Sequence, residues 1–336
     1  MKINVSVILL LALFIISCKK GEVERISPYE FRSPDHFPVA TYAFINNEVT
    51  QERFELGKRL FFDPLLSVDN TISCATCHAQ VHAFADHNIA LSIGVDDRVG
   101  MRNSPSIANM AWNPSFMWDG GINHLEMVSI APITDPNEMG EEMGNVIQKL
   151  NASSSYSELF KRAYGSSIIT DQLLFRALTN YMVMIISDHS KYDYWMKGLV
   201  NFNADELAGH TIFQAKCAHC HSGTLQTDFS FRNNGLDSIF TDLGRGLITA
   251  NPEENGKFKV PSLRNVMMTY PYMHDGRFFT IKQVLDHYSS GIVNSSTLDE
   301  SLKNGIPLTD EEKNALITFL FTLNDYELID NEYLNE

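Results

Sequence analysis

Two copies of the pattern Cys-x-x-Cys-His constrain the fold of this chain more than any other feature of its sequence. Together they hold four of the five cysteines, and each histidine directly follows its second cysteine. The residues of the two copies are Cys74, Cys77, His78, Cys217, Cys220 and His221. Any fold of this chain therefore has to bring two thiols and one imidazole together at two separate places.

Three kinds of chemistry use paired cysteines, and only one of them uses the whole pattern. A thioredoxin-type redox pair does not need the trailing histidine, and neither copy lies in a βαβ pattern. A single zinc site uses cysteine pairs that lie much closer in sequence than these two. In c-type haem attachment, both thiols bind the macrocycle and the adjacent histidine ligates the iron. The sequence therefore predicts two covalent c-type haems, with His78 and His221 on the irons.

The N-terminal residues predict export. An apolar run from Val5 to Ile16 is too short to span a bilayer comfortably and is typical of a signal peptide. It ends in Ile-Ile-Ser-Cys, which resembles the bacterial lipobox, where Cys18 would become the lipid-bearing first residue. We predict a signal peptide over residues 1–17, a tether over residues 18–48, and a periplasmic protein held at a membrane by lipid. A plain signal peptide with a chance cysteine is the alternative.

Length and charge limit the class of protein further. A chain of 336 residues favours two domains. The formal net charge of −15 excludes nucleic acid as a partner, because phosphate binding needs a basic surface. An acidic body is suited instead to a basic protein partner.

Helical periodicity dominates the rest of the chain. The spacing of apolar residues predicts helices over residues 50–62, 145–150, 157–164, 171–187 and 205–214. A capping box from Thr309 to Glu312 predicts the start of one more helix. Strand signals are scarce. The predicted fold is therefore mainly α, with two cytochrome c-like haem domains that carry long irregular loops, at residues 49–197 and 198–336.

Longer motifs point to one known family. They are LGKRLFFDPLLS before the first haem motif, RNSPS at Arg102–Ser106, FMWDG at Phe116–Gly120, EMG at Glu138–Gly140, and FKVPSLRNV and TYPYMHDGRFFT after the second. In these motifs the chain resembles the bacterial di-haem cytochrome c peroxidases and their relative MauG. The likeness covers nearly all of the chain beyond the predicted tether.

The resemblance implies roles for the two haems and for two side chains. In this family the N-terminal haem meets hydrogen peroxide and the C-terminal haem passes electrons to it. Glu138 matches the carboxylate that moves protons between the peroxide oxygens; taken alone, it would be read as a solvated loop acid. Trp118 matches the tryptophan that lies between the haems and relays electrons, although a tryptophan is also a common core residue.

Two departures from the family pattern concern the first haem. In many relatives a histidine closes the peroxidatic iron of the resting enzyme, and Val95 stands at that position here. His82 and His87 lie nearby but out of register, and we interpret them as loop histidines. The first haem is therefore predicted to be open without activation, as in MauG-like members. Val128 stands where many relatives carry a glutamine on the distal side.

The second haem needs a sixth ligand, and the position matching the family's axial methionine is Tyr288. MauG-like members have a tyrosine there, whose phenolate should stabilise ferric iron and lower the potential. His287 and Met273 are the alternatives. Tyr288 could also be a core residue with a hydrogen-bonded hydroxyl.

The family further implies a calcium ion between the domains, with Asn103 and the carbonyls of Thr269 and Pro271 as oxygen ligands. A homodimer is also implied.

Three functions are compatible with these features. The leading one is a peroxidase that reduces hydrogen peroxide with electrons from a small cytochrome c or copper protein. A MauG-like oxidase would use peroxide to modify a protein side chain at a distance. A non-enzymatic di-haem electron carrier would have two six-coordinate haems and no use for Glu138. Kinship of fold alone does not separate them.

Overall fold

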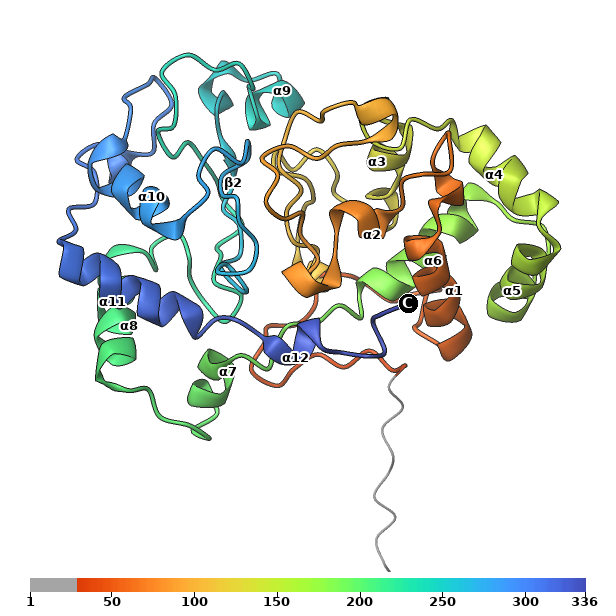
Figure 1. Ribbon diagram of the computed structural model, residues 1–336, viewed down its shortest axis with the longest axis horizontal. Coiled ribbons are helices and arrows are strands. Elements are labelled where there is room, and N and C mark those ends of the chain that lie inside the picture. The colour runs from red at the N-terminus through yellow and green to blue at the C-terminus, as the bar shows by residue number, and fades with distance from the viewer. Residues whose placement is uncertain (1–28) are drawn as a thin grey trace, which may run out of the picture.

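The computed structural model describes residues 29–336 and is predominantly helical (Figure 1). Its only strands in that range, β1 (Phe231–Arg232) and β2 (Phe258–Lys259), pair antiparallel. The helices are α1 Gln51–Phe62, α2 Cys74–Cys77, α3 Ile130–Thr134, α4 Met143–Ala152, α5 Ser154–Tyr164, α6 Asp171–Met182, α7 Lys191–Met196, α8 Ala204–Lys216, α9 Arg245–Thr249, α10 Ile281–Asp286, α11 Asp310–Phe321 and α12 Tyr326–Ile329. The predicted signal peptide and Cys18 lie outside the described residues.

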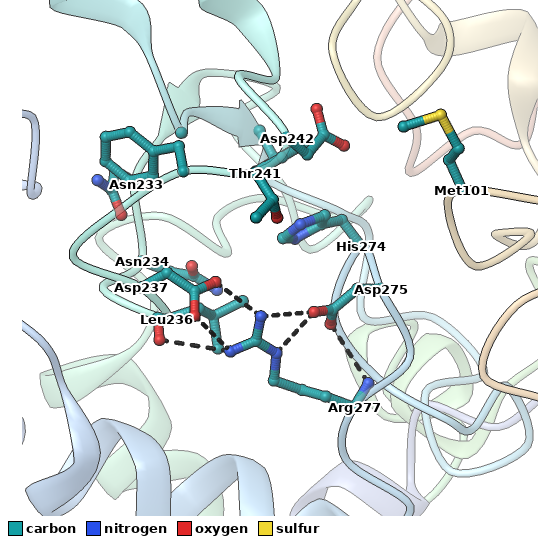
Figure 2. Close-up of a pocket in the computed structure, with 13 residues that line it drawn as sticks. Met101, Asn233, Asn234, Leu236, Asp237, Thr241, Asp242, His274, Asp275 and Arg277 are labelled. Atoms are coloured by element: carbon teal, nitrogen blue, oxygen red, sulfur yellow. Dashed lines mark hydrogen bonds and ion pairs between the residues drawn. The ribbon is translucent and has the colours of Figure 1, made fainter.

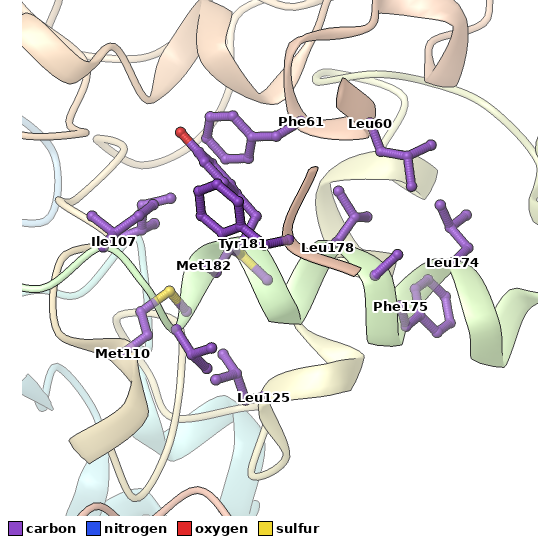
Figure 3. Close-up of a cluster of buried hydrophobic side chains, with 14 of the residues drawn as sticks. Leu60, Phe61, Ile107, Met110, Leu125, Leu174, Phe175, Leu178, Tyr181 and Met182 are labelled. Atoms are coloured by element: carbon purple, nitrogen blue, oxygen red, sulfur yellow. The ribbon is translucent and has the colours of Figure 1, made fainter. Parts of the chain in front are cut away.

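A crossing of α1 and α6 organises the first half of the molecule. The side chain of Thr50 caps α1, which ends before the Asp63-Pro64 step. Gly57 allows close approach, because a Cβ there would lie 2.0 Å from the carbonyl oxygen of Ala177 on α6. Figure 3 shows the apolar side chains gathered at this crossing, where the rings of Phe61 and Tyr181 lie 4.9 Å apart.

A second crossing, between α8 and α11, repeats the arrangement. A Cβ on Gly209 would lie 2.0 Å from the carbonyl oxygen of Ala315. Capping boxes start both helices: Asn203 with Glu206 on α8 and Thr309 with Glu312 on α11. The predicted capping box at Thr309 is therefore confirmed. In both halves a glycine-mediated helix crossing lies beside a Cys-x-x-Cys-His motif, as the prediction of two cytochrome c-like units requires.

Two hydrophobic clusters define two lobes that lie side by side (Figure 1). We call the part of the chain around α1 and α6 the first lobe and the part around α8 and α11 the second. The ends of the lobes interlock: Tyr192 on α7 packs in the second cluster, whereas Leu328 and Leu334 near the C-terminus pack in the first. The hydroxyl of Tyr181 donates to the carbonyl of Leu334 at 2.6 Å and fixes this return.

Residues 29–48 differ from the free tether predicted for them. Phe37 is buried in the first cluster, and Phe31 and Phe44 pack against it. The backbone of Tyr42 donates to the carbonyl of Ala111 at 2.9 Å. The segment contains many aromatic residues, and burying them favours a packed strap along the body.

Helix α6 ends at Met182, five residues before the predicted end. The side chain of Asn109 explains the early stop, because it forms two hydrogen bonds with the backbone of Ser187, at 2.9 and 3.1 Å. These bonds replace helical ones and draw the chain out toward the second lobe. Within residues 29–336, no helix has the length and apolar character needed to cross a bilayer.

Candidate functional site

The first Cys-x-x-Cys-His motif forms one helical turn, α2. The side chains of Ser73 and Thr76 form a capping box that starts the turn. Cys74 and Cys77 are three residues apart in this turn, so both thiols lie on one face. The backbone of His78 donates to the carbonyl of Cys74 at 2.9 Å. This geometry sets the two attachment atoms beside one histidine.

The imidazole of His78 is oriented as an iron ligand would be. Its Nδ1 lies 3.0 Å from the carbonyl oxygen of Phe84 and donates to it. The unprotonated Nε2 is then the atom that can bind iron, which is the usual pattern for metal-ligating histidines. Burial lowers the pKa of His78 and keeps the ring neutral. These residues fit a c-type haem.

The second motif repeats the first. The backbone of His221 donates to the carbonyl of Cys217 at 3.1 Å, and its Nδ1 lies 3.3 Å from the carbonyl oxygen of Gln226. Arg264 holds the loop between His221 and Gln226, which we call the second haem loop, because its Nε donates to the carbonyl of Thr224 at 2.8 Å. His221 is therefore presented through Nε2, like His78.

The thiols do not suit the two rival chemistries. Burial raises the pKa of Cys74 to about 12 and that of Cys217 to about 12, whereas redox-active thiols have a lowered pKa. In residues 29–336, no group of three or more His, Cys, Asp or Glu side chains is arranged to hold a metal ion. The four thiols therefore do not gather into one zinc site.

Glu138 lies beside the first motif. It is near enough to both Cys74 and Cys77 to raise the pKa of each thiol. The backbone of Glu138 is held by the segment that contains Gly94 and Val95. The N–H of Val95 donates to the carbonyl of Glu138 at 2.8 Å. A Cβ on Gly94 would lie 2.3 Å from that carbonyl oxygen, so glycine is required for the contact. Burial raises the pKa of Glu138 to about 7, with a smaller contribution from Asp135.

The residues at the two departures from the family pattern are apolar. Val95 is 2% exposed and packs against the loop that carries Glu138. Val128 packs against the first hydrophobic cluster. The rings of His82 and His87 stack on one another, and His87 contacts Tyr270 of the second lobe. Both histidines are therefore engaged at the boundary between the lobes.

Trp118 joins the lobes. Its indole N–H donates to the carbonyl of Asn103 in the first lobe at 2.8 Å. Its own carbonyl accepts from the backbone N–H of Lys259, on β2 of the second lobe, at 2.7 Å. The Nζ of Lys259 donates to the carbonyl of Ser115 at 2.7 Å, and burial lowers its pKa to about 8. The tryptophan is half-buried in this boundary and is fixed from both sides.

Tyr288 faces the second motif. It lies in a π-helical turn, η7 (His287–Gly291), directly after α10, and such turns are frequent at functional sites. Burial raises the pKa of Tyr288 to about 12, and the thiols of Cys217 and Cys220 act in the same direction, which shows that they are close.

The alternatives to Tyr288 are held by other bonds, both to Asn234. The Nε2 of His287 lies 2.9 Å from the carbonyl oxygen of Asn234. The Sδ of Met273 lies 3.3 Å from the side-chain nitrogen of the same residue. Asn234 also shares a hydrogen bond with Tyr288. Sequence reasoning missed Asn234, because only the tertiary structure brings it to these three side chains.

The residues expected to bind calcium lie on both sides of the boundary. Asn103 is 5% exposed, and its backbone donates to the carbonyl of His274 at 2.7 Å, in the loop that contains Thr269 and Pro271. Its side-chain nitrogen is within 3.3 Å of the carbonyls of Ile89 and Ala90, so the amide orientation is fixed.

Asn234 also lines a pocket that is formed mostly by the second lobe, with Met101 reaching it from the first (Figure 2). Arg277 lies at one side of it and pairs with Asp237 and Asp275. His274 lines another side, stacked on Phe258 with ring centroids 3.7 Å apart. None of the residues predicted for the haem, peroxide or calcium sites lines this pocket.

The chain is similar to known proteins along almost its whole described length. The family model of di-haem cytochrome c peroxidase matches residues 51–201, and that of cytochrome c matches residues 207–324. Methylamine utilization protein MauG of Methylorubrum extorquens is 36% identical over 300 residues, covering 87% of this chain and 83% of the relative. Cytochrome c551 peroxidase of Nitrosomonas europaea is 36% identical over 239 residues, covering 69% and 71%.

Solved structures show the same likeness. The crystal structure of a MauG-like protein associated with microbial copper homeostasis has a TM-score of 0.84 at 30% identity. The match covers 91% of this chain and 99% of that one. The mainly helical fold with two cytochrome c-like units is thus found in a relative of nearly the same extent.

Proposed function

Since the chain belongs to the family of di-haem cytochrome c peroxidases and MauG, we propose that it reduces hydrogen peroxide to water. One peroxide takes up two electrons and two protons and gives two waters. The observation that carries the proposal is the placement of Glu138, a carboxyl group with a pKa of about 7, beside the first haem motif. A plain electron carrier has no use for such a group there.

The proposed mechanism divides the work between haem and protein. When bound, the first haem would supply the redox-active iron at which peroxide is reduced. Glu138 acts as base toward the peroxide oxygen that binds and returns the proton to the oxygen that leaves. Its pKa near 7 lets it serve in both directions near neutral pH. With Val95 at the position of the family's closing histidine, the chain would offer no imidazole ligand from that position.

Electrons for the reaction are proposed to enter at the second haem and cross the boundary at Trp118. The support is structural: Trp118 is hydrogen-bonded to both lobes, at 2.8 and 2.7 Å. We further propose a small cytochrome c or copper protein as electron donor, for which an acidic molecule with a net charge of −15 is suited. Export, a lipid on Cys18 and a homodimer are part of the same proposal, on sequence grounds.

A MauG-like oxidase is the second candidate function. Val95, Tyr288 and the similarity to MauG proteins favour it. In that case the oxidising equivalents of peroxide would oxidise a side chain of a partner protein. Peroxide consumption that depends on an added protein, and not on a small donor, would distinguish it.

Two measurements on the purified ferric protein test the proposed function. We expect electron paramagnetic resonance (EPR) to show one high-spin and one low-spin haem, because Val95 stands where many relatives carry the histidine that closes the first iron. Stopped-flow mixing with a reduced small cytochrome c should show its oxidation on adding peroxide, at two electrons per peroxide. Two low-spin signals and no donor oxidation would show that the protein is an electron carrier and not a peroxidase.

Tyr288 is proposed as the sixth ligand of the second haem. Replacing it with Phe removes the oxygen that would bind and keeps the ring. We expect the low-spin signal of the second haem to become high-spin or to change its g-values, and its reduction potential to rise. The exposed Tyr333→Phe variant is the matched control and should behave as the unmodified protein. An unaltered low-spin signal in Tyr288→Phe would remove Tyr288 as a ligand.

Calcium is proposed to join the lobes through Asn103, Thr269 and Pro271. Asn103 supports this proposal, because it is buried and hydrogen-bonded to the loop that holds the other two. A chelator should lower the thermal midpoint, by an amount equivalent to about 2.7 kcal/mol if calcium was present at 100 times its dissociation constant. Added calcium should restore the midpoint and added magnesium should not. Equal midpoints with and without chelator would exclude the site.

A further inference from the structure

Two histidines and one tyrosine meet where the lobes touch. The rings of His82 and His87 are parallel within 5°, with centroids 3.7 Å apart. Tyr270 reaches them from the second lobe, and its hydroxyl oxygen lies 3.0 Å from Nε2 of His87. Its carbonyl accepts from the backbone N–H of Asn88 at 3.4 Å. A phenol of one lobe thus shares a hydrogen bond with an imidazole of the other.

On one side, the cluster adjoins the proximal histidine of the first haem motif. His82 ends the short turn η2 (Gln80–His82), which follows the motif almost directly. Phe84, between the two stacked histidines in sequence, supplies the carbonyl that holds Nδ1 of His78. Burial lowers the pKa of both His78 and His82, and the buried side chain of Asp86 is near enough to both to offset part of that effect. The stack therefore belongs to the immediate surroundings of the first haem.

On the other side, the cluster connects to the second haem motif. The loop from Tyr270 leads to Met273, whose sulfur lies 3.3 Å from the side-chain nitrogen of Asn234. Asn234 in turn shares a hydrogen bond with Tyr288, which faces Cys217 and Cys220. The chain and its hydrogen bonds thus form a route from one haem site to the other that does not pass through Trp118.

The bonding of His87 suits it to take a proton from Tyr270. Its Nδ1 is buried and has no partner among the described residues, so the contact with the tyrosine is the hydrogen bond that orients the ring. A phenol gives up an electron far more readily when its proton leaves at the same time, and a hydrogen-bonded imidazole is the side chain suited to receive it. The side chain of Asp86 accepts from the backbone N–H of His87 at 2.8 Å and fixes the backbone that carries the ring.

We propose that Tyr270 is a redox-active relay residue between the two haem sites and that His87 is its proton acceptor. One electron leaves the phenol for the oxidising equivalent that hydrogen peroxide deposits at the first haem site. The O–H proton moves to Nε2 of His87, and a neutral phenoxyl radical remains. An electron arriving from the second haem site, together with the returning proton, restores the phenol. This relay rests on the proposed peroxide reaction and adds a second route beside Trp118.

The radical itself is the readout. The ferric protein is mixed with one equivalent of peroxide in the absence of donor, frozen within a second and examined by EPR. We expect a radical signal that narrows when the protein carries ring-deuterated tyrosine. Tyr270→Phe should reduce this tyrosine signal at least tenfold. Tyr272→Phe, from the same loop, is the matched control and should retain it.

A second variant tests the role of His87. Gln at this position keeps a hydrogen-bond acceptor but cannot take up a proton near neutral pH. We expect His87→Gln to lower the yield of the tyrosine radical at least tenfold and to abolish the slowing of its formation in D₂O. A normal radical yield in His87→Gln would overturn the assignment of the proton acceptor.

Failure of the relay is distinguishable from failure of the proposed function. If peroxide is consumed but the signal is insensitive to tyrosine deuteration, or persists in Tyr270→Phe, the relay is wrong and the peroxidase proposal stands. If peroxide is not consumed, a photogenerated ruthenium(III) complex replaces it as one-electron oxidant. The difference in tyrosine radical yield between Tyr270→Phe and Tyr272→Phe then tests the relay independently of the peroxide reaction.

Discussion

Replacing Glu138 with Gln should lower peroxide turnover by roughly 100-fold to 10,000-fold, the range typical of a lost general acid–base group. Glutamine keeps the size and the polarity of the side chain but cannot exchange a proton. The backbone contact that positions the residue, from Val95 to the carbonyl of residue 138, does not involve the side chain. Both haems should therefore still be attached, with unchanged ferric spectra. Steady-state oxidation of a reduced cytochrome c by peroxide measures the loss.

The pH dependence gives a sharper test of the same residue. Glu138 must start as the carboxylate, so turnover should rise as pH increases through about 7. Glu138→Gln should lose this rise together with the activity. Glu142→Gln, a nearby change outside the proposed mechanism, should keep both. If the rise survives in Glu138→Gln, another group controls proton delivery.

Local sequence was sufficient to predict the parts of the structure that local interactions determine. The predicted capping box from Thr309 to Glu312 starts a helix, and the helix predicted over residues 50–62 begins at Gln51, with the side chain of Thr50 as its cap. Family resemblance, and not local sequence, predicts the role of Glu138, and the structure adds the contacts that hold its backbone in position. Gly94, directly before Val95, leaves room for the backbone that carries Glu138.

What sequence could not show depends on contacts between distant segments. Helix α6 stops early because Asn109 captures Ser187, and no local signal precedes that stop. The strap over residues 29–48 lacks periodicity, yet Phe37 is buried against groups from both lobes. The sequence indicates loop positions for His82 and His87, and the stacking of their rings and the hydrogen bond of His87 to Tyr270 are apparent only in the assembled lobes.

The largest effect on stability is expected at Asp193. Its side chain is fully buried and contacts the guanidinium of Arg264 at 2.6 and 2.9 Å. His36 of the strap lies 2.8 Å away, and the side chain of Ser190 donates to the same carboxylate at 2.6 Å. Although burial alone would raise the pKa of Asp193, Arg264 and Ser190 hold it well below its usual range. The carboxylate is therefore charged at neutral pH and joins the strap, α7 and the second haem loop.

Asp193→Asn should destabilise the folded protein by about 3–5 kcal/mol, because it leaves the buried charge of Arg264 without a partner. The exposed pair of Glu300 and Lys303 is the matched control, and Glu300→Gln should cost less than about 1 kcal/mol. Midpoints of denaturant unfolding at pH 7 measure both.

Because the pKa of Asp193 is depressed, the contribution of the pair is present at pH 7 and is lost only as pH falls below about 4. Arg264 also holds the carbonyl of Thr224, so the spectrum of the second haem should change with Asp193→Asn and that of the first should not. Equal midpoints for the two variants would show that the pair is not what holds the strap and the second haem loop together.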